Sequence, residues 1–205
     1  VLLKGAAKDW PLFTKWSKDY ITNNMGSYVC KIIQDSRPAY AKDQTTLKFY
    51  FDKLKNVSTL TLDPFIQNKP PLFYRDIKTP NSFFTTKDIQ RFFFFHSIKD
   101  AGTLPHNHGN AFNILQDGEK EWVFYDANQT HNINGYQTLM KSNKEYPPGT
   151  HAKDWFNKEI PKLLKKVDKV FCCTQEAGDI VFIPKGYCHA VLNKSEVMGI
   201  VFETY

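Results

Sequence analysis

The chain has 205 residues, of which 41% are hydrophobic and 15% aromatic, so it is long enough to bury a substantial core and is not intrinsically disordered. It contains no apolar run of about 18 residues, so we expect no membrane span. The net charge of +6 comes mainly from lysines spread along the chain, with only three arginines, so we expect no nucleic acid as a partner.

The first half of the chain predicts a mixture of strands and helices. Short apolar runs predict strands over residues 1–5, 28–33 and 71–77. Apolar side chains at three- and four-residue spacing predict helices over 10–21 and 45–56, the second with a threonine cap. We expect residues 1–100 to form a mixed α/β region.

The second half is typical of an all-β fold. A helical insert is predicted over 152–167, and the lysine run Lys162, Lys165, Lys166 and Lys169 is interpreted as solvated and mostly on that helix. Helices do not alternate with strands as a doubly wound fold requires, so a sandwich or jelly roll is favoured. The predicted strands, rich in β-branched and aromatic residues, cover 121–126, 169–175, 178–184, 189–193 and 197–205.

Three of the six histidines can form a metal site. His106 and His108 are one residue apart, so on an extended segment both side chains point to the same face. His189 follows a strand and a tight turn, and begins the next strand. In a jelly roll this strand can lie beside the first, so three imidazoles can converge on a divalent metal and leave positions open for a substrate or oxygen. The others are interpreted as loop or core residues: His96, His131 and His151.

Two segments of the second half resemble the motifs of the jumonji-C (JmjC) or cupin-type hydroxylases. Residues 178–193 read Gly-Asp, an apolar strand, Pro, a turn, His and then Asn, like the late motif of that family. Residues 103–122 run from a Thr through His-x-His to Gly-x-Lys-x-Trp, like its early motif. The resemblance covers nearly the whole chain. It implies one domain over 1–205, a double-stranded β-helix with flanking helices, whose core barrel spans 101–205 with the 1–100 region packed on it.

The resemblance also implies roles for individual residues. His106 would be the first metal ligand and His189 the last. Thr103 and Lys120 would bind the distal carboxylate of 2-oxoglutarate, and Asn193 would line the inside of the barrel next to the cofactor. The metal implied is Fe(II), and the activity implied is oxidation of a protein side chain.

The chain departs from the family pattern at the second ligand. The family has Asp or Glu there, whereas this chain has His108. A neutral imidazole in place of a carboxylate raises the charge at the metal by one unit, so zinc, nickel or copper can compete with iron. The same departure resembles a JmjC subgroup of the endoplasmic reticulum lumen.

Three functions therefore remain open. The first is a 2-oxoglutarate-dependent hydroxylase that acts on protein side chains, and the second is a three-histidine dioxygenase that does not use 2-oxoglutarate. The third is a binding or regulatory module that keeps the fold without catalysis. We do not expect histone demethylation, because a basic protein is a poor partner for a basic histone tail.

Three Asn-x-Ser/Thr sequons favour a secretory history and a place in the endoplasmic reticulum lumen or secretory pathway. The chain begins at Val1 rather than a methionine, which indicates a trimmed sequence. Asn56 and Asn128 lie near predicted loops and are the expected glycan acceptors. We expect no glycan on Asn193, because the matching family position faces the barrel interior.

The cysteines leave the redox state open. Cys172 and Cys173 are neighbours on a predicted strand, so their side chains point to opposite faces and at most one can lie inside a barrel. A disulfide from one of them to Cys30 or Cys188 is compatible with the sequence and not required by it.

Overall fold

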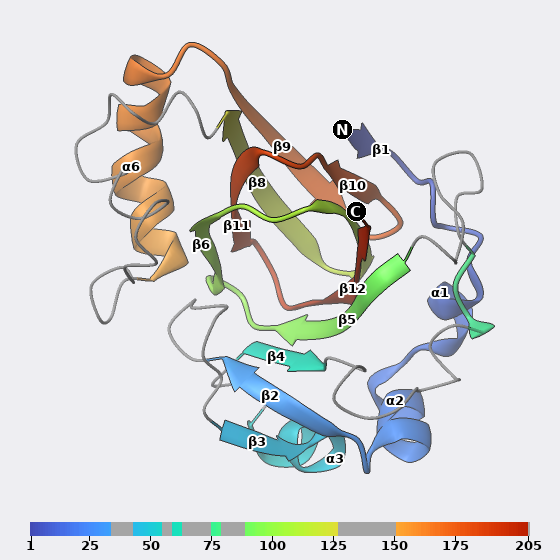
Figure 1. Ribbon diagram of the computed structural model, residues 1–205. Helices are drawn as coiled ribbons and strands as arrows, with labels where there is room; N and C mark the ends of the chain where they lie inside the picture. Colours follow the sequence, from blue (N-terminus) through green and yellow to red (C-terminus); the bar gives the residue numbers. More distant parts are fainter. Residues whose placement is uncertain (34–42, 55–58, 63–74, 79–88, 127–150, 205) are drawn as a thin grey trace.

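The computed structural model describes residues 1–33, 43–54, 59–62, 75–78, 89–126 and 151–204, and these ranges form two antiparallel sheets (Figure 1). The larger sheet has the strand order β1-β10-β7-β12-β5-β4-β2-β3, and the smaller has the order β6-β11-β8-β9. The strands are β1 Leu2–Leu3, β2 Val29–Ile33, β3 Asp43–Thr46, β4 Thr59–Leu62, β5 Ile89–Ser97, β6 Gly102–His106, β7 Asn110–Asp117, β8 Glu119–Asp126, β9 Val170–Glu176, β10 Ile180–Ile183, β11 Tyr187–Asn193 and β12 Val197–Thr204.

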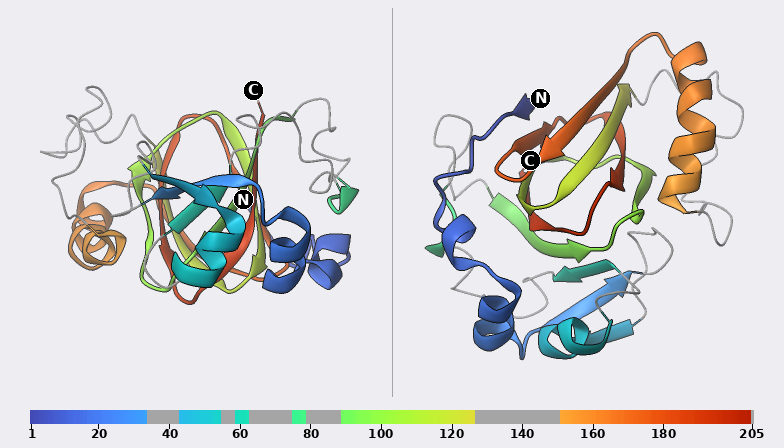
Figure 2. Two further views of the ribbon diagram at one scale, coloured as in Figure 1. Left: turned by 90° about the horizontal axis from the view of Figure 1, so that it is seen from below. Right: turned by 180° about the vertical axis from the view of Figure 1, so that it is seen from behind.

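Four strands from each sheet close into the barrel of a jelly roll. In the larger sheet these are β10, β7, β12 and β5, and they face the whole smaller sheet (Figures 1 and 2). Every pairing in both sheets is antiparallel, so the prediction of a mainly β jelly roll is confirmed. The larger sheet continues past β5 into β4, β2 and β3, which joins the N-terminal region to the barrel through one hydrogen-bonded ladder.

Side-chain alternation along β8 shows how the barrel wall separates inside from outside. Trp122 and Phe124 belong to the cluster inside the barrel, whereas Val123 and Tyr125 point outward. Helix α6 (Ala152–Lys166) covers this outer face with Trp155 among its buried side chains. The predicted helix over 152–167 therefore agrees with the structure to within one residue. Figure 2 shows α6 and the N-terminal helices on opposite sides of the barrel.

The predicted helix over 10–21 is two helices, α1 (Pro11–Lys15) and α2 (Lys18–Met25). Trp16 is extended between them because its indole Nε1 donates to the buried carboxylate of Asp76 at 3.1 Å. Ser17 then starts the second helix, since its hydroxyl accepts from the backbone N–H of Tyr20. Apolar periodicity alone did not reveal this break.

The predicted helix over 45–56 starts at α3 (Leu47–Phe49), where the side chain of Thr46 caps it as expected, and continues as a π-helix over Tyr50–Leu54. The predicted strand over 71–77 is wrong for its described part, because Arg75 and Asp76 form a helical turn and Ile77 is not in a strand. Residues 71–74 lie outside the described ranges.

No sequence pattern predicted β3, β4, β5 and β7, although β5 and β7 are barrel strands. The apolar runs of β5 and β7 are largely buried on both faces, so these two strands lack the alternation that marks a half-exposed strand. In the described part of the chain, no helix is both long and apolar enough to cross a membrane.

Candidate metal centre

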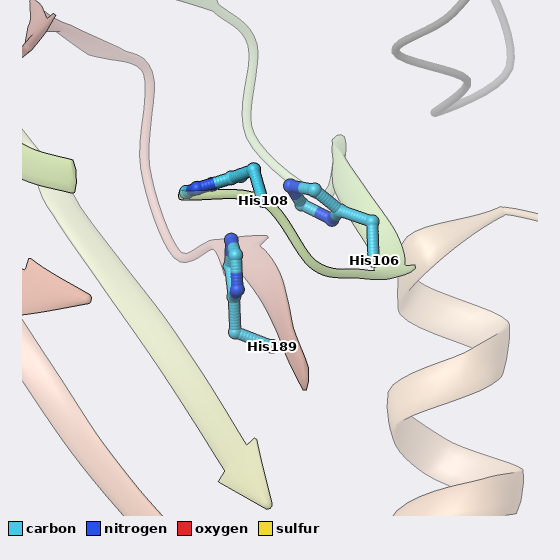
Figure 3. Close-up of side chains that lie close together, drawn as sticks. All are labelled: His106, His108 and His189. Atoms are coloured by element: carbon cyan, nitrogen blue, oxygen red, sulfur yellow. The ribbon is translucent and has the colours of Figure 1, made fainter. Parts of the chain in front are cut away.

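Three histidines meet at one end of the barrel, where β6 ends and β11 begins (Figure 3). His106 is the last residue of β6, and it pairs directly with His189 of β11 in the antiparallel ladder. His108 follows two residues later, on the loop that leads into β7. The β6–β11 ladder shifts its register between this pair and the next pair, Val191 with Thr103.

The three imidazoles are close enough to share one metal ion. The ring centroids are 4.2 Å apart for His106 and His189, 4.7 Å for His108 and His189, and 5.5 Å for His106 and His108. One ligand atom from each lies within 4.8 Å of the other two. A central ion would then be about 2.8 Å or less from each nitrogen, so shifts of roughly 0.7 Å reach the bond length of 2.0–2.1 Å.

Each ring is oriented by a hydrogen bond from its Nδ1 atom to a backbone carbonyl. The acceptors are the carbonyls of Leu104 at 2.8 Å for His106, Gly109 at 2.8 Å for His108 and Tyr187 at 3.4 Å for His189. A carbonyl only accepts, so Nδ1 carries the proton and Nε2 keeps its lone pair. The three rings therefore present the tautomer that a divalent metal binds, with the outer-shell partners typical of metal-ligating histidines.

Burial keeps two of the rings neutral. Desolvation lowers the pKa of His106 to about 4, and desolvation together with the neighbouring histidines lowers the pKa of His189 well below its usual value. Trp122 and Phe124 form the apolar wall around His189, which is 2% exposed. The site therefore needs no loss of a proton from these rings at neutral pH before a metal can bind.

A second polar group lies deeper in the barrel, in the row formed by Asn193, Lys120 and Gln175 on neighbouring strands. Lys120 is only 6% exposed, and no carboxylate in the described part of the chain pairs with its ammonium. Its Nζ lies 3.6 Å from the centroid of the Phe95 ring. Desolvation lowers the pKa of Lys120 to about 7.

Two buried polar atoms in the barrel have no hydrogen-bond partner among the described residues: Oγ1 of Thr103 and Oδ1 of Asn113. Buried polar groups rarely stay unpaired without a reason, and an absent ligand is one such reason. The buried cation of Lys120 and the unpaired hydroxyl of Thr103, which can donate a hydrogen bond, fit a small carboxylate, as the resemblance implies for both residues. Asn113 was not predicted as a site residue; its signal in the sequence is one polar residue between the apolar residues of β7.

Asn193 is held in the barrel by hydrogen bonds of its side-chain amide. Its side-chain amide donates to the hydroxyl of Ser97 at 2.8 Å and to the carbonyl of Ile98 at 3.1 Å, and the residue is 2% exposed. Asn193 lies beside Lys120 in the row of polar residues described above. Because its side chain is buried and already bonded, a glycan on it would not fit the folded barrel. The other predicted acceptors, Asn56 and Asn128, lie outside the described residues.

No disulfide joins the four cysteines, all of which lie in the described part of the chain. Cys173 packs on the cluster inside the barrel, whereas Cys172 is exposed, so the two neighbours point to opposite faces as predicted. Burial raises the pKa of both Cys30 and Cys188 to about 12, and these thiols are therefore protonated at neutral pH.

Comparison with known proteins decides the family. Residues 1–203 match the model of the cupin-like domain. The chain belongs to the cupin-like domain family. It is also 24% identical over 227 aligned positions to the arginine-specific demethylase JMJ22 of Arabidopsis thaliana, a JmjC protein; the alignment covers 98% of this chain and 40% of that relative. The cupin-like chain thus spans about 40% of the length of this curated relative.

Proposed function

We propose that this cupin-like domain is a metal-dependent oxygenase of the JmjC type that uses Fe(II) and 2-oxoglutarate to oxidise a side chain of a protein. One observation carries the proposal: three imidazoles with bare Nε2 atoms converge in the same barrel that buries the unpaired cation of Lys120. A metal with 2-oxoglutarate would supply the oxidising chemistry, because protein side chains do not carry it.

The chain's own residues would bind, orient and shield. His106, His108 and His189 would hold the metal, and their carbonyl partners would fix the rings. Lys120, with Thr103, would hold the far carboxylate of 2-oxoglutarate through charge-assisted hydrogen bonds. The apolar wall of the barrel would exclude water from this pocket.

Two features favour particular alternatives. The replacement of a family carboxylate by His108 favours a three-histidine dioxygenase without 2-oxoglutarate, or a module without catalysis. The name of the Arabidopsis relative favours a second reaction, removal of a methyl group from arginine. We also propose a site of action in the endoplasmic reticulum lumen, supported by the His-x-His resemblance to jumonji-domain-containing protein eight and by the sequons.

The test combines metal analysis with titration of 2-oxoglutarate. Protein purified without chelators should hold one divalent metal per chain, and His189→Ala should abolish this binding while the β-rich circular dichroism spectrum persists. His151→Ala is the matched control, because His151 is exposed at the start of α6 and lies outside the triad.

Calorimetric titration with 2-oxoglutarate then distinguishes an oxygenase that uses this cosubstrate from a three-histidine dioxygenase that does not. Lys120→Met should leave the metal content unchanged and weaken 2-oxoglutarate binding roughly 10- to 100-fold, the range expected for lost hydrogen bonds to a charged group. Oxygen consumption that depends on 2-oxoglutarate supports the proposal. Equal 2-oxoglutarate affinity in wild type and Lys120→Met, or wild-type protein that binds no metal, contradicts it.

A further inference from the structure

A row of side chains runs across the inner face of the smaller sheet at the metal end of the barrel. In the ladder, His106 is opposite His189, His189 is opposite Phe124, and Phe124 is opposite Phe171. Neighbouring strands lie about 4.8 Å apart, so the backbone of Phe171 lies about 10 Å from that of His189. The triad and Phe171 thus belong to one continuous wall.

Phe171 differs from the rest of this wall because it is 54% exposed, whereas Phe124 beside it is 8% exposed. Burying a phenylalanine stabilises a fold by about 1.5–3 kcal/mol, so an exposed one beside a polar centre suggests a binding surface. A second exposed apolar side chain, Leu164 at 57%, lies on the last turn of α6, which leads into β9 at this end (Figure 1).

The same end of the barrel is basic. The exposed lysines are Lys165 and Lys166 at the end of α6, Lys169 between α6 and β9, and Lys185 in the turn between β10 and β11. No ion pair joins any of these four to an acid in the described part of the chain. The acidic residues nearest to these lysines on the same segments are Asp126 and Asp168. Positive charge therefore exceeds negative charge on this part of the surface. We call this surface the basic-aromatic rim: Leu164, Phe171, Lys165, Lys166, Lys169 and Lys185.

We infer that the basic-aromatic rim binds the protein substrate through an acidic segment whose bulky apolar side chain packs on Phe171. This inference rests on the oxygenase proposed above and names its substrate class. An extended chain rises about 3.3 Å per residue, so the apolar side chain would stand about three residues from the residue that reaches the triad.

The position of Phe171 favours a polypeptide over a membrane. Phe171 lies on the inner wall, in line with the triad, where an extended chain can follow the row of side chains into the barrel. A flat lipid surface would instead contact the outward-facing Leu164 and the lysines of α6. Acidic flanks complement the lysines and speed association at low salt.

Fluorescence anisotropy with short labelled peptides tests the inference. The probe has one Phe flanked by glutamates; one comparator replaces the glutamates with lysines, and another replaces the Phe with Ser. The Glu–Phe peptide should bind at least about tenfold more tightly than either comparator, and less tightly at raised salt.

Variants of the full chain locate the binding. The triple variant K165E/K166E/K169E and Phe171→Ser should each weaken binding about tenfold, and Phe171→Leu should keep most of it because it stays apolar. The control K53E/K99E/K158E makes the same charge change at exposed lysines outside the rim. Melting curves of every variant identify a fold defect.

Equal loss of affinity in the control variant would overturn the inference, as would tighter binding of the lysine peptide. Stronger binding to phosphatidylserine vesicles than to the peptide, lost in the triple variant, would also overturn it in favour of a membrane. Metal content is measured on the same samples. Peptide binding by protein that holds no metal would refute the proposed oxygenase and support binding at the basic-aromatic rim. Metal binding without peptide binding would refute the inference about the rim alone.

Discussion

Lys120 is a cation in a place where charge is costly. It is 6% exposed, its pKa is lowered by desolvation to about 7, and the Phe95 ring offsets only part of the cost. A side chain that lowers stability in this way is typical of a functional site. The same burial would make its hydrogen bonds to a bound carboxylate strong.

Lys120→Met should therefore stabilise the ligand-free protein by about 1–4 kcal/mol at pH 6–7. The unfolded lysine titrates near 10.5 and the folded one near 7, so between these values the unfolded chain binds more protons. Wild-type stability should then rise with pH from 7 to 10.5, and the advantage of the variant should shrink. Urea unfolding across this range measures the difference; an advantage that is absent, or constant with pH, would contradict the burial of a cation.

His108 determines the charge at the proposed metal. His108→Asp would restore the carboxylate of the family pattern. The ratio of iron(II) affinity to zinc affinity should therefore be at least about tenfold higher in the variant than in wild type. Competition between the two metals, followed by metal analysis, measures the ratio, with His151→Asp as the control. An unchanged ratio would show that His108 is not a ligand. If the variant also turns over 2-oxoglutarate, the absence of the carboxylate is what prevents catalysis in the wild-type protein.

Strand β6 holds the metal end of the barrel in position. It begins at Gly102, where an added Cβ would clash with the carbonyl oxygen of Val191 on β11. Only glycine permits this approach of the two backbones, because a backbone atom cannot rotate away as a side chain can. The position of His106 at the end of the same strand depends on this contact.

Gly102→Ala should lower the free energy of unfolding by roughly 1–3 kcal/mol and weaken metal binding, because β6 must move away from β11. Gly186→Ala is the control: its φ of +87° makes alanine strained, yet no atom lies within 4 Å of the new Cβ. The control should lose about 1 kcal/mol and keep its metal affinity. Equal metal affinity for Gly102→Ala and wild type would show that β6 does not set the site.

The N-terminal region and the barrel form one continuous ladder through β4 and β5. A hydrogen-bond network that starts at the buried pair Tyr50 and His96 and reaches the surface at Glu196 crosses the same junction. The buried His96 donates from Nε2 to Glu196 at 2.7 Å, because a carboxylate only accepts, and its Nδ1 then accepts from the hydroxyl of Tyr50 at 2.9 Å. Lys18 of α2 completes the network at Glu196. We therefore expect the chain to unfold as one cooperative unit.

Tyr50→Phe tests this unity. The loss of the hydroxyl leaves Nδ1 of His96 without its donor in a buried place, which should cost about 1–3 kcal/mol. Tryptophan fluorescence and far-ultraviolet circular dichroism should still report one coincident transition at a lower temperature. Tyr20→Phe, at a partly exposed position, should change stability by less than about 0.5 kcal/mol. Two separated transitions would divide the chain into independent domains.

The sequence by itself determined the fold class, the family resemblance and the three candidate ligands. These depend on local chemistry: alternating strands, turn residues and the motif around His106 and His189. It also determined that Cys172 and Cys173 face opposite ways, because side-chain direction in a strand follows position. The break between α1 and α2 could not be predicted from the sequence, because Asp76, which accepts the hydrogen bond from the Trp16 indole, lies 60 residues away in the chain.

Only the tertiary structure decided which side chains share the barrel. The β6–β11 register brings His106 beside His189, and the unpaired Oδ1 of Asn113 became visible only once its surroundings were known. Exposure has the same origin: Phe171 and Phe124 are the same residue type in neighbouring strands, yet one is open and the other covered. Register and burial are set by contacts between distant segments, so no local pattern encodes them.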